Sequence, residues 1–463
     1  MLKFFSNFSA ARIANWIFLL GYFVVFSTIG DWDRPKTNAG AGVITSDTFE
    51  YYSYITMTFI SGDPFYQNWE EDPHWEHAWV QETPGGSERT IKMTMGMSML
   101  YAPFFGIAHT YAKITGQKAD GYSTPYQFGM IFSVLFWMGI GLYCLRKVLE
   151  KHFSSMVVLL TLIVLMLATN INWYLFVRVG ITHPYTFSLS AILLFVVTRW
   201  YEAPSYRDTI IIGGLLGLMT LIRPVNILFS SIFLLWGLTS FEAAKGRLRL
   251  FLRQFKMIGL IALCAFLVLL PQFIFWKMTT GSFLYYTYHD EGFFFANPQF
   301  YQSLLGYRNG WLRYTPVMFL PLIGIPFLWF KLREWFWVVV TFIPLYIYVV
   351  VSWWCWWYIG YGNRAMIDAY AVLSLPLACL IATVWQGKTW RKVAMASIVL
   401  LFVAHNIFQT VQCRLDIIHI SAMNEAAYWK TFLSLDRPEK YGEMLNYPNV
   451  RAAKLGVEVV DPK

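Results

Sequence analysis

Charged residues are scarce in this chain: Asp, Glu, Lys and Arg make up 14% of its 463 residues. Soluble domains carry about 25% charged residues, so the deficit excludes an ordinary soluble protein. Hydrophobic residues reach 57% and aromatic residues 19%. Several apolar runs reach the roughly 17–25 residues that a helix needs to cross a bilayer. The composition therefore predicts an all-α, polytopic membrane protein.

Cysteine is also scarce, with five residues in the chain. They are scattered, mostly inside apolar runs and without the spacing of metal ligands: Cys144, Cys264, Cys355, Cys379 and Cys413. Thiols placed in this way are predicted to be small packing residues, which excludes a disulfide framework and a zinc site. The chain also lacks an internal repeat, a low-complexity tract and a nucleotide-binding glycine loop.

Eleven apolar runs are predicted to cross the membrane as helices. They cover residues 12–30, 125–145, 154–172, 182–200, 208–222, 225–240, 256–276, 314–330, 335–353, 366–385 and 392–411. No small-residue cleavage site follows the first run, which is therefore predicted to be a retained helix and not a signal peptide. Arg223-Pro224 separates two of the runs, and a helix must break there because proline lacks the N–H that would continue it.

The net charge of +9 would suggest nucleic acid as a partner of a soluble protein. Here most Lys and Arg residues stand in short loops between apolar runs, the pattern that orients membrane helices. Residues 93–113 decide the orientation. If these residues crossed the membrane, the basic loops 146–151 and 245–256 would face outward. If they are re-entrant or interfacial, both loops lie on the cytoplasmic side, as basic loops usually do. We therefore expect a cytoplasmic N-terminus, a C-terminus outside, and no nucleic acid partner.

Four segments are then predicted to lie on the outer side. The first is a long, acid-rich loop, residues 31–124, with amphipathic helices. The second is the loop 277–313, and the third is a short loop that carries "WWCWWYIGYGNR". The fourth is a polar tail, 412–463, which follows a transmembrane module formed by residues 1–411.

The stretch "GVITSDTFEYYSYI" places two carboxylates among aromatic and aliphatic side chains just after the first predicted span. Wound as a helix, it sets Asp47, Glu50 and Tyr54 on one face. The opposite face carries Phe49, Tyr52, Ile55 and Phe59. Gly62-Asp63-Pro64 is expected to end the helix. The segment alone favours an amphipathic helix lying at the membrane surface with solvated acids; the alternative is one wall of an active site.

Further charged and polar residues are predicted at the outer ends of the spans. Ionisable groups at membrane depth are costly and usually face a cavity or a partner. The set comprises Lys92, Asp120, Arg178, His183, Arg223, Tyr288, His289, Asp290, Glu291, Arg308, Arg313, Tyr314, Arg364 and Asp368. Each alone is more often an anchor or a structural ion pair. Together, one or two acids ringed by cations and tyrosines indicate a pocket for a phosphorylated, lipid-attached substrate.

Five motifs, in this order, give the chain a resemblance to a known superfamily: "SDTFEYY", "THPYTFSL", "GLLGLMTLIRPVN", "GYRNGWLRYTP" and "GYGNRAMID". From about residue 10 to about 430 the sequence resembles the GT-C integral-membrane glycosyltransferases. It is most similar to the branch of the protein O-mannosyltransferases and lipid A aminoarabinose transferases, which includes many bacterial members. The resemblance implies a GT-C-like helical bundle in the bacterial inner membrane with a periplasmic active site.

The activity that the resemblance implies is inverting transfer of a sugar from a polyprenyl-phosphate donor, such as an undecaprenyl-phosphate sugar, to an acceptor hydroxyl. The acceptor is a lipid, a glycan or a protein, and membrane lipids surround the enzyme. Asp47 matches the catalytic acid-base residue of such enzymes, although Ser46 and Thr48 flank it where the family often has a second acid. Glu50, one helical turn on, could assist.

Basic residues hold the lipid phosphate in these enzymes, and Lys92 and Arg223 are the first candidates here, followed by Arg313 and Arg364. Site support is expected from Glu50, Asp120, His183, Tyr288, His289, Asp290, Arg308 and Tyr314. The oligosaccharyltransferase signature "WWDYG" is absent. The run "WWCWWYIGYG" only echoes it and is predicted to be an aromatic belt at the membrane interface.

Other interpretations stay open at this point. No cofactor is certain; a divalent metal held by His183 or His289 with Asp47 or Asp290 is less favoured than packing or hydrogen-bonding histidines. A transporter or flippase for a lipid-linked substrate would show two similar halves with paired broken helices, and the chain has a single Arg-Pro break. A catalytically inactive subunit of an envelope complex is another alternative. A further one is an envelope transferase that moves acyl or phosphoethanolamine groups, but the sequence shows no convincing nucleophilic centre or zinc site for it.

Overall fold

Helices make up almost all of the regular structure in the described part of the chain. The computed structural model describes residues 42–65, 80–82 and 89–457. Within these residues the strands form a single antiparallel hairpin, β1 (Val80–Glu82) and β2 (Arg89–Ile91). The fold class predicted from the sequence, an all-α polytopic membrane protein, is confirmed.

Five helices among the described residues are long and apolar enough to cross a membrane. They are α5 (Thr124–Glu150), α12 (Phe255–Thr280), α16 (Arg333–Val351), η6 (Arg364–Ala369) continued by α17 (Tyr370–Trp385), and α18 (Thr389–Arg414). The other predicted spans after residue 124 correspond to α6 (Ser155–Leu167), α8 (Thr182–Glu202), α9 (Tyr206–Ile222), η4 (Pro224–Phe229) with α10 (Ser230–Leu235), and η5 (Pro316–Met318) with α15 (Phe319–Lys331). The first predicted span, 12–30, lies outside the described residues.

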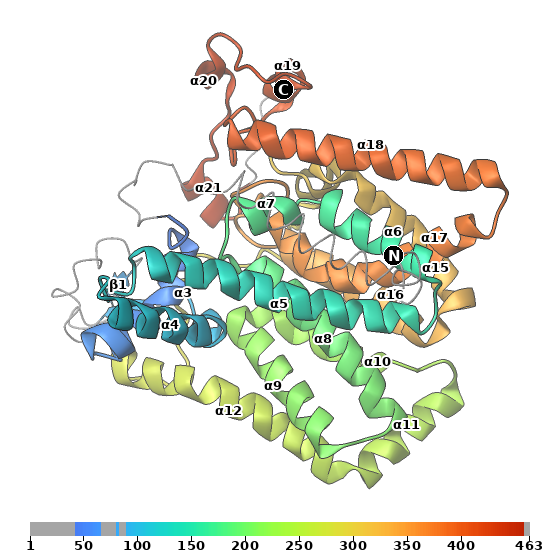
Figure 1. Ribbon diagram of the computed structural model, residues 1–463, viewed down its shortest axis with the longest axis horizontal. Coiled ribbons are helices and arrows are strands. Elements are labelled where there is room, and N and C mark those ends of the chain that lie inside the picture. Colours follow the sequence, from blue (N-terminus) through green and yellow to red (C-terminus); the bar gives the residue numbers. More distant parts are fainter. Residues whose placement is uncertain (1–41, 66–79, 83–88, 458–463) are drawn as a thin grey trace.

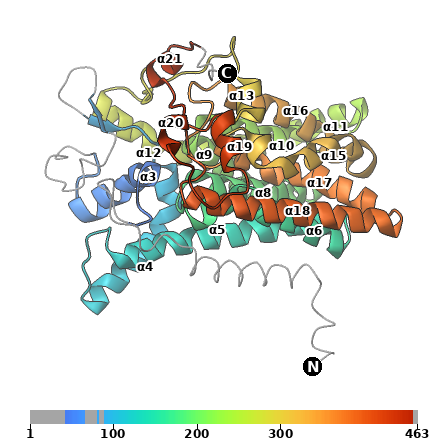
Figure 2. The ribbon, with the colours of Figure 1, turned by 90° about the horizontal axis from the view of Figure 1, so that it is seen from above.

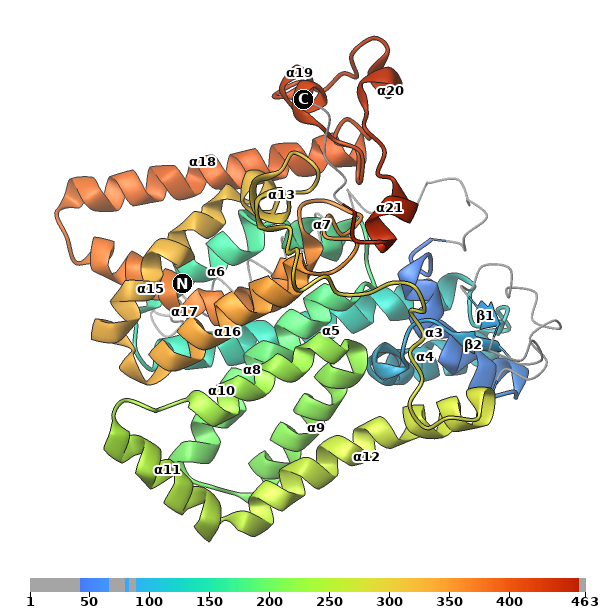
Figure 3. The same cartoon turned by 180° about the vertical axis from the view of Figure 1, so that it is seen from behind.

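The helices lie side by side and run back and forth, so that the bundle has two different ends (Figure 1). One end, the loop end, gathers α3 (Asp47–Thr56), α4 (Gly96–Thr115) and the hairpin. The opposite end, the basic end, carries short connections and α11 (Phe241–Arg253), from which α12 runs along the edge of the bundle back toward α3 and α4 (Figure 3).

The predicted helix break at Arg223-Pro224 is confirmed. Helix α9 ends at Ile222, Arg223 has the extended backbone angles φ −151° and ψ 123°, and η4 begins at Pro224. Since proline cannot donate the next helical hydrogen bond, the chain turns here and not one residue later. The break leaves the Arg223 side chain at the loop end.

Residues predicted as a re-entrant or interfacial segment form one continuous helix, α4, which runs through Pro103. The re-entrant alternative is therefore wrong, because a re-entrant segment requires two half-helices joined by a turn. Figure 2 shows α4 projecting from the bundle beside α3. Its start is pinned by close packing: a Cβ at Gly96 would lie 2.7 Å from the backbone nitrogen of Ile222.

Helix α3 forms where the sequence predicts it, and after a short π-helical continuation, η1 (Met57–Ser61), Gly62 ends it in the left-handed conformation. The predicted exposure of its polar face is wrong. On that face Glu50 is 1% and Tyr54 6% exposed, because α4, the α4–α5 connection and α12 cover the helix. Tyr54, for example, packs edge-on against Phe275 of α12 and donates a hydrogen bond to the carbonyl of Met93.

Short helices and the tail complete the loop end. They are α7 (Ile171–Phe176), α13 (Phe300–Leu305), α14 (Trp311–Tyr314), and, after α18, α19 (Glu425–Thr431), α20 (Tyr441–Met444) and α21 (Val450–Lys454). Arg308, in the loop between α13 and α14, is buried and donates a hydrogen bond to the carbonyl of Asn446 in the tail. The tail is therefore part of the folded loop end.

Candidate active site

Asp47, the predicted base, stands at the first position of α3 and is paired with a cation from the far end of the sequence. The Nη2 atom of Arg364 lies 2.8 Å from Oδ2 of Asp47, and the two side chains are 19% and 21% exposed. The chain enters α3 through Ser46 in the left-handed region, at φ 50°. Gly180 lies so close to this turn that a Cβ there would stand 2.7 Å from Cγ2 of Thr48.

The charge state of Asp47 follows from its surroundings. Burial raises the pKa of this carboxyl, but Arg364 and Arg178 lower it by more, so that the pKa lies below its ordinary value. Arg178 also approaches the start of α3, with Nη2 3.4 Å from the hydroxyl of Ser46. Asp47 is therefore ionised at neutral pH and can accept a proton only if its cationic partners move or are themselves neutralised.

A second carboxylate, Asp368, organises the cations behind Asp47. It has no exposed surface, and its Oδ1 lies 2.7 Å from Nδ1 of His183. Its Oδ2 accepts hydrogen bonds from the hydroxyl of Tyr346, at 3.1 Å, and from Nη1 of Arg223, at 3.5 Å. The guanidinium of Arg223 lies 5.6 Å from the ring centre of Tyr358. Asp368 thus fixes Arg223 at the point where α9 breaks.

Lys92 lies between β2 and α4 and interacts electrostatically with Glu50 of α3. Its Nζ lies 2.6 Å from Oε1 of Glu291, and both side chains are buried. The ring of Tyr288 stands 5.2 Å from the ammonium, and the hydroxyl of Thr287 donates a hydrogen bond to the Lys92 carbonyl. These contacts hold Lys92 against the second predicted outer loop.

Glu50 differs from Asp47 although the two are one helical turn apart. Burial and the neighbouring charge of Asp47 raise the pKa of Glu50 well above its ordinary value, against the opposing effect of Lys92. Its Oε2 is buried and has no hydrogen-bond partner among the described residues. Burial thus favours the neutral form of Glu50, whereas Arg364 and Arg178 favour the ionised form of Asp47, and acid-base sites use such opposite shifts.

These groups form one site and not three separate ion pairs. Glu50 interacts electrostatically with Asp47, Lys92 and Glu291. Buried Tyr51, on the same helix, interacts with Tyr288, Asp47, Arg223 and Arg364. We refer to the set as the charge cluster: Asp47, Glu50, Lys92, Arg223, Glu291, Arg364 and Asp368.

Several predicted site residues lie elsewhere. Asp120 accepts hydrogen bonds from the backbone N–H groups of Tyr122 and Ser123, in the turn before α5. Although burial raises its pKa, these bonds and Lys118 lower it to about 2. Asp120 therefore stabilises a turn, and the prediction that it supports the site is not met by this geometry.

Arg313, which was predicted to bind the donor phosphate, also lies away from the charge cluster. Its guanidinium lies 3.7 Å from the ring centre of Tyr307, and its Nε donates to the carbonyl of Leu305. Tyr314 donates its hydroxyl hydrogen to the carbonyl of Tyr307. Arg308 holds the tail, as described above. These residues build the floor beneath the tail instead of lining the charge cluster.

The metal arrangement considered from the sequence does not form. His183 is bonded to Asp368 rather than to Asp47, and His289 packs edge-on against Tyr285. Asp290 is paired with Lys454 of the tail, with Nζ 2.9 Å from Oδ1. Across the described part of the chain, no three His, Cys, Asp or Glu side chains are placed to hold a metal ion.

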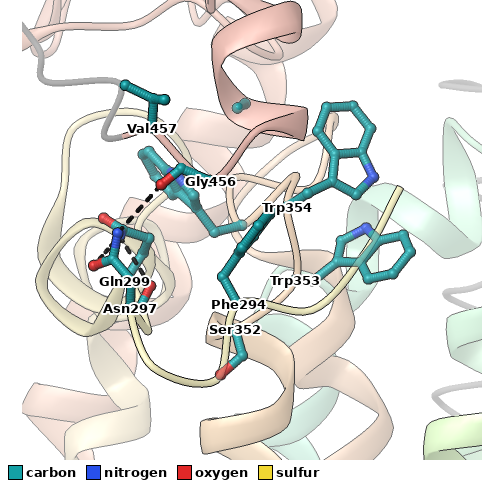
Figure 4. A pocket seen from close by; sticks show the side chains of 10 residues that line it. Phe294, Asn297, Gln299, Ser352, Trp353, Trp354, Gly456 and Val457 are labelled. Carbon is teal, nitrogen blue, oxygen red and sulfur yellow. Dashed lines mark hydrogen bonds between the residues drawn. The ribbon is translucent and has the colours of Figure 1, made fainter. Parts of the chain in front are cut away.

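The tryptophan run turns inward, so its prediction as an aromatic belt facing lipid is wrong for its central residues. Trp356 and Trp357 are 4% and 1% exposed and pack edge-on against each other. Trp353 stands edge-on to Tyr288, with ring centres 5.5 Å apart. A small pocket, partly open to solvent, lies beside this run (Figure 4).

Two carboxylates of the charge cluster, Asp368 and Glu291, were in the predicted outer set but were not selected as site residues. Asp368 carried a usable signal: it is an acid at the start of a strongly apolar run, where an ionisable group needs a partner. Nothing in the sequence distinguishes Glu291 from Asp290 beside it. Their roles differ because only Glu291 turns toward Lys92.

Comparisons with known proteins do not identify the function of this chain. No family model matches the sequence, and no curated protein matches it. Among solved structures, the chain is similar to the apo crystal structure of an oligosaccharyltransferase from Archaeoglobus fulgidus. The two are 13% identical with a TM-score of 0.49, over 94% of this chain and 59% of that chain. This chain thus spans less than two thirds of that protein, and its function has to follow from the charge cluster.

Proposed function

We propose that this protein is a membrane glycosyltransferase that transfers a sugar from a polyprenyl-phosphate carrier to an acceptor hydroxyl, with inversion at the anomeric carbon. The observation that carries the proposal is the Asp47–Arg364 pair: an ionised carboxylate held by a guanidinium at the loop end. Arg223 and Lys92 interact electrostatically with Tyr51 and Glu50 of the same helix. One base beside several cations suits a reaction that removes a proton from one substrate and releases an anion from the other.

The cations match the change in charge of the donor. The donor is a phosphodiester with one negative charge, and its leaving group is a phosphate monoester that gains a second charge as the C–O bond breaks. Groups that stabilise this growing charge more than the ground state accelerate the reaction. Arg223 suits this role because its guanidinium carries five N–H donors, more than Asp368 and Tyr358 accept.

Asp47 completes the reaction from the acceptor side. The acceptor hydroxyl attacks the anomeric carbon through a transition state with oxocarbenium character, and its proton passes to the Asp47 carboxylate. One displacement of this kind inverts the configuration. The new C–O bond forms as the bond to the phosphate oxygen breaks, and the electron pair leaves with the phosphate.

The pairing of Asp47 with Arg364 keeps the basicity of Asp47 low until the donor binds. An arginine salt bridge makes a carboxylate a weak base, as the lowered pKa of Asp47 reflects. A phosphate placed beside Arg364 competes for the same guanidinium, because bidentate arginine–phosphate contacts are strong. Donor binding therefore loosens Arg364 from Asp47 and raises the basicity of the carboxylate when the acceptor arrives.

Membrane placement follows the distribution of charge. Short basic connections lie at one end of the bundle, and Lys and Arg are retained in cytoplasmic loops. This supports a bacterial inner-membrane protein whose loop end, with the charge cluster, faces the periplasm. A lipid-linked donor fits such a site because it needs no nucleotide from the cytoplasm.

The proposal is tested by the Asp47→Asn variant in a reconstituted assay with polyprenyl-phosphate sugars. Loss of the base is expected to lower kcat by about 10²–10⁴-fold. Asp416→Asn is the matched control: Asp416 is an exposed acid at the loop end, paired with Arg437, and its backbone φ of 52° suits asparagine. Half or more of the parental rate in Asp47→Asn protein, with normal folding, would refute the assignment.

A further inference from the structure

Helix α11, at the basic end, presents three different faces, and none of its residues is fully buried. One face is half-buried against the protein and carries Ala243, Arg247, Leu250 and Phe251. A second face, the apolar stripe, consists of Phe241, Leu248 and Leu252, each more than 60% exposed. A third face, the basic stripe, consists of exposed Lys245, Arg249 and Arg253. The spacing of these residues places the apolar stripe between the half-buried face and the basic stripe.

The rotation of α11 about its axis is fixed by Arg247. Its Nη1 lies 2.6 Å from the hydroxyl oxygen of Tyr201 in α8 and 3.1 Å from the carbonyl oxygen of Leu234 in α10. Its Nη2 donates a hydrogen bond to the carbonyl of Trp236. Because these bonds hold one face of the helix against the protein, the apolar stripe and the basic stripe both point away from it.

The bilayer has to lie close to α11, because Gln254 alone separates this helix from α12. Helix α12 has 26 residues and is apolar enough to cross a membrane by itself. Its length of about 39 Å exceeds the hydrocarbon thickness of about 30 Å, so α11 is not needed for the crossing. Figure 3 shows α11 turned away from the direction of α12. An amphipathic helix at this position lies in the membrane interface.

The basic stripe determines which lipids suit this helix. In the described part of the chain, neither Arg249 nor Arg253 forms an ion pair or a side-chain hydrogen bond. The ammonium of Lys245 lies 4.6 Å from the ring centre of Phe241 and has no acidic partner there. Glu242 is the single acid of the helix. Exposed cations beside an apolar stripe at the membrane surface attract anionic headgroups.

We propose that α11 binds anionic phospholipids in the leaflet at the basic end. The apolar stripe enters the acyl region, and the basic stripe contacts the headgroup phosphates. An acidic soluble protein fits less well, because it would have to cover an apolar stripe that the neighbouring acyl chains already reach. The lipid contact goes beyond the proposed glycosyl transfer and does not depend on it.

The test is fluorescence quenching at the apolar stripe of the full-length protein. A bimane label is attached to Leu252→Cys in a Cys264→Ala background, and the protein is reconstituted into phosphatidylcholine vesicles. The vesicles also contain phosphatidylglycerol or phosphatidylcholine with a nitroxide at the same acyl carbon. We expect phosphatidylglycerol to quench at an about fivefold lower content, because each cation near the surface favours anionic lipid. High salt should weaken this preference by screening.

Two double variants show whether the basic stripe is responsible. Lys245→Gln/Arg249→Gln should be quenched equally by both labelled lipids, and its quenching by phosphatidylcholine shows that the helix still lies on the bilayer. The matched control is Lys430→Gln/Arg451→Gln, which also removes one Lys and one Arg, both exposed in the tail. This control should keep the preference of the parental protein.

Three results would overturn the proposal. Equal quenching of the parental protein by both lipids means that the helix has no preference for anionic lipid. Absence of quenching by either lipid means that the apolar stripe faces water or a protein partner. A preference that persists in Lys245→Gln/Arg249→Gln means that the basic stripe does not bind the headgroups. None of these results bears on Asp47, so the glycosyl transfer is tested separately.

Discussion

At the scale of single residues, the site contains two carboxyl groups, one helical turn apart, whose pKa values are shifted in opposite directions. Arg364 favours the ionised form of Asp47, and burial favours the neutral form of Glu50. In the proposed reaction, a neutral Glu50 would add no second negative charge beside the donor phosphate. The pair therefore keeps the electrostatic potential at Arg223 and Lys92 attractive for an anion.

The charge state of Glu50 predicts a pH-dependent stability. A carboxyl whose pKa is raised in the folded state stabilises the protein fully below its unfolded pKa, near 4.5. That contribution is lost as the pH rises through the folded pKa, by at most about 1.4 kcal/mol per pH unit. Glu50→Gln protein should therefore unfold at the parental temperature near pH 4.5 and at a higher temperature at pH 8, measured by thermal unfolding in detergent.

An exposed glutamate provides the control for this measurement. Glu443 lies on the surface of α20, so Glu443→Gln should follow the parental protein at both pH values. If Glu50→Gln is no more stable than the parental protein at pH 8, Glu50 is ionised in the folded protein and the separation of charge states is wrong.

At the scale of elements, η6 connects most of the site. This short 3₁₀ segment carries Arg364 at its start and Asp368 near its end. Through these two residues it reaches α3, the start of α8, the break after α9, and α16. The position of the Asp47 partner is thus coupled to the position of Arg223.

Removing the charge of Asp368 should disturb both stability and donor binding. Asp368→Asn leaves Arg223 without its buried counter-ion, and breaking a buried pair in this way costs about 3–5 kcal/mol. We expect a lower unfolding temperature and a donor KM raised more than kcat is lowered, because Arg223 is no longer positioned. Tyr346→Phe, which removes a neutral hydrogen bond to the same carboxylate, should cost about 1 kcal/mol and spare the KM. An unchanged donor KM in Asp368→Asn would contradict the role of Arg223.

Local rules explain which elements could be predicted from the sequence. The break at Arg223-Pro224 follows from a missing N–H, and the end of α3 follows from Gly62, so both were predicted correctly. The pairing of Asp47 with Arg364 spans 317 positions and leaves no periodic signal. The burial of α3 was missed for a related reason, because its amphipathic pattern is the same whether water or polar protein groups cover the polar face.

For the basic residues, too, the sequence does not reveal which partner each one has in the fold. Arg223, Arg308 and Arg313 all lie at the outer ends of predicted spans and carry equal charges. Their roles diverge only through tertiary partners: Asp368 for Arg223, the tail for Arg308, and Tyr307 for Arg313. Residue type and predicted depth in the membrane could nominate these cations, and only the fold could separate them.

At the scale of the whole molecule, the two ends of the bundle differ. Helices α3 and α4 and the tail helices lie at the loop end, while the amphipathic helix α11 lies at the other (Figure 1). Arg247 anchors α11 by stacking on Tyr201, 3.9 Å from the ring centre. Leu248 and Leu252 of this helix are more than 60% exposed, as expected for a helix at a membrane surface.

This asymmetry predicts a single orientation in the membrane. Tyr447 of the tail and Trp390 at the start of α18 are exposed at opposite ends, at 61% and 64%. With a membrane-impermeant maleimide applied to intact spheroplasts, Tyr447→Cys should be labelled and Trp390→Cys only after the membrane is opened. The native cysteines give a low background, because four of the five are buried and Cys264 is half-buried within the apolar helix α12. Labelling of Trp390→Cys in closed spheroplasts would show that the orientation in the membrane is the reverse of the predicted one. It would also move the charge cluster to the cytoplasmic face, where a nucleotide sugar rather than a lipid-linked donor would be the natural substrate.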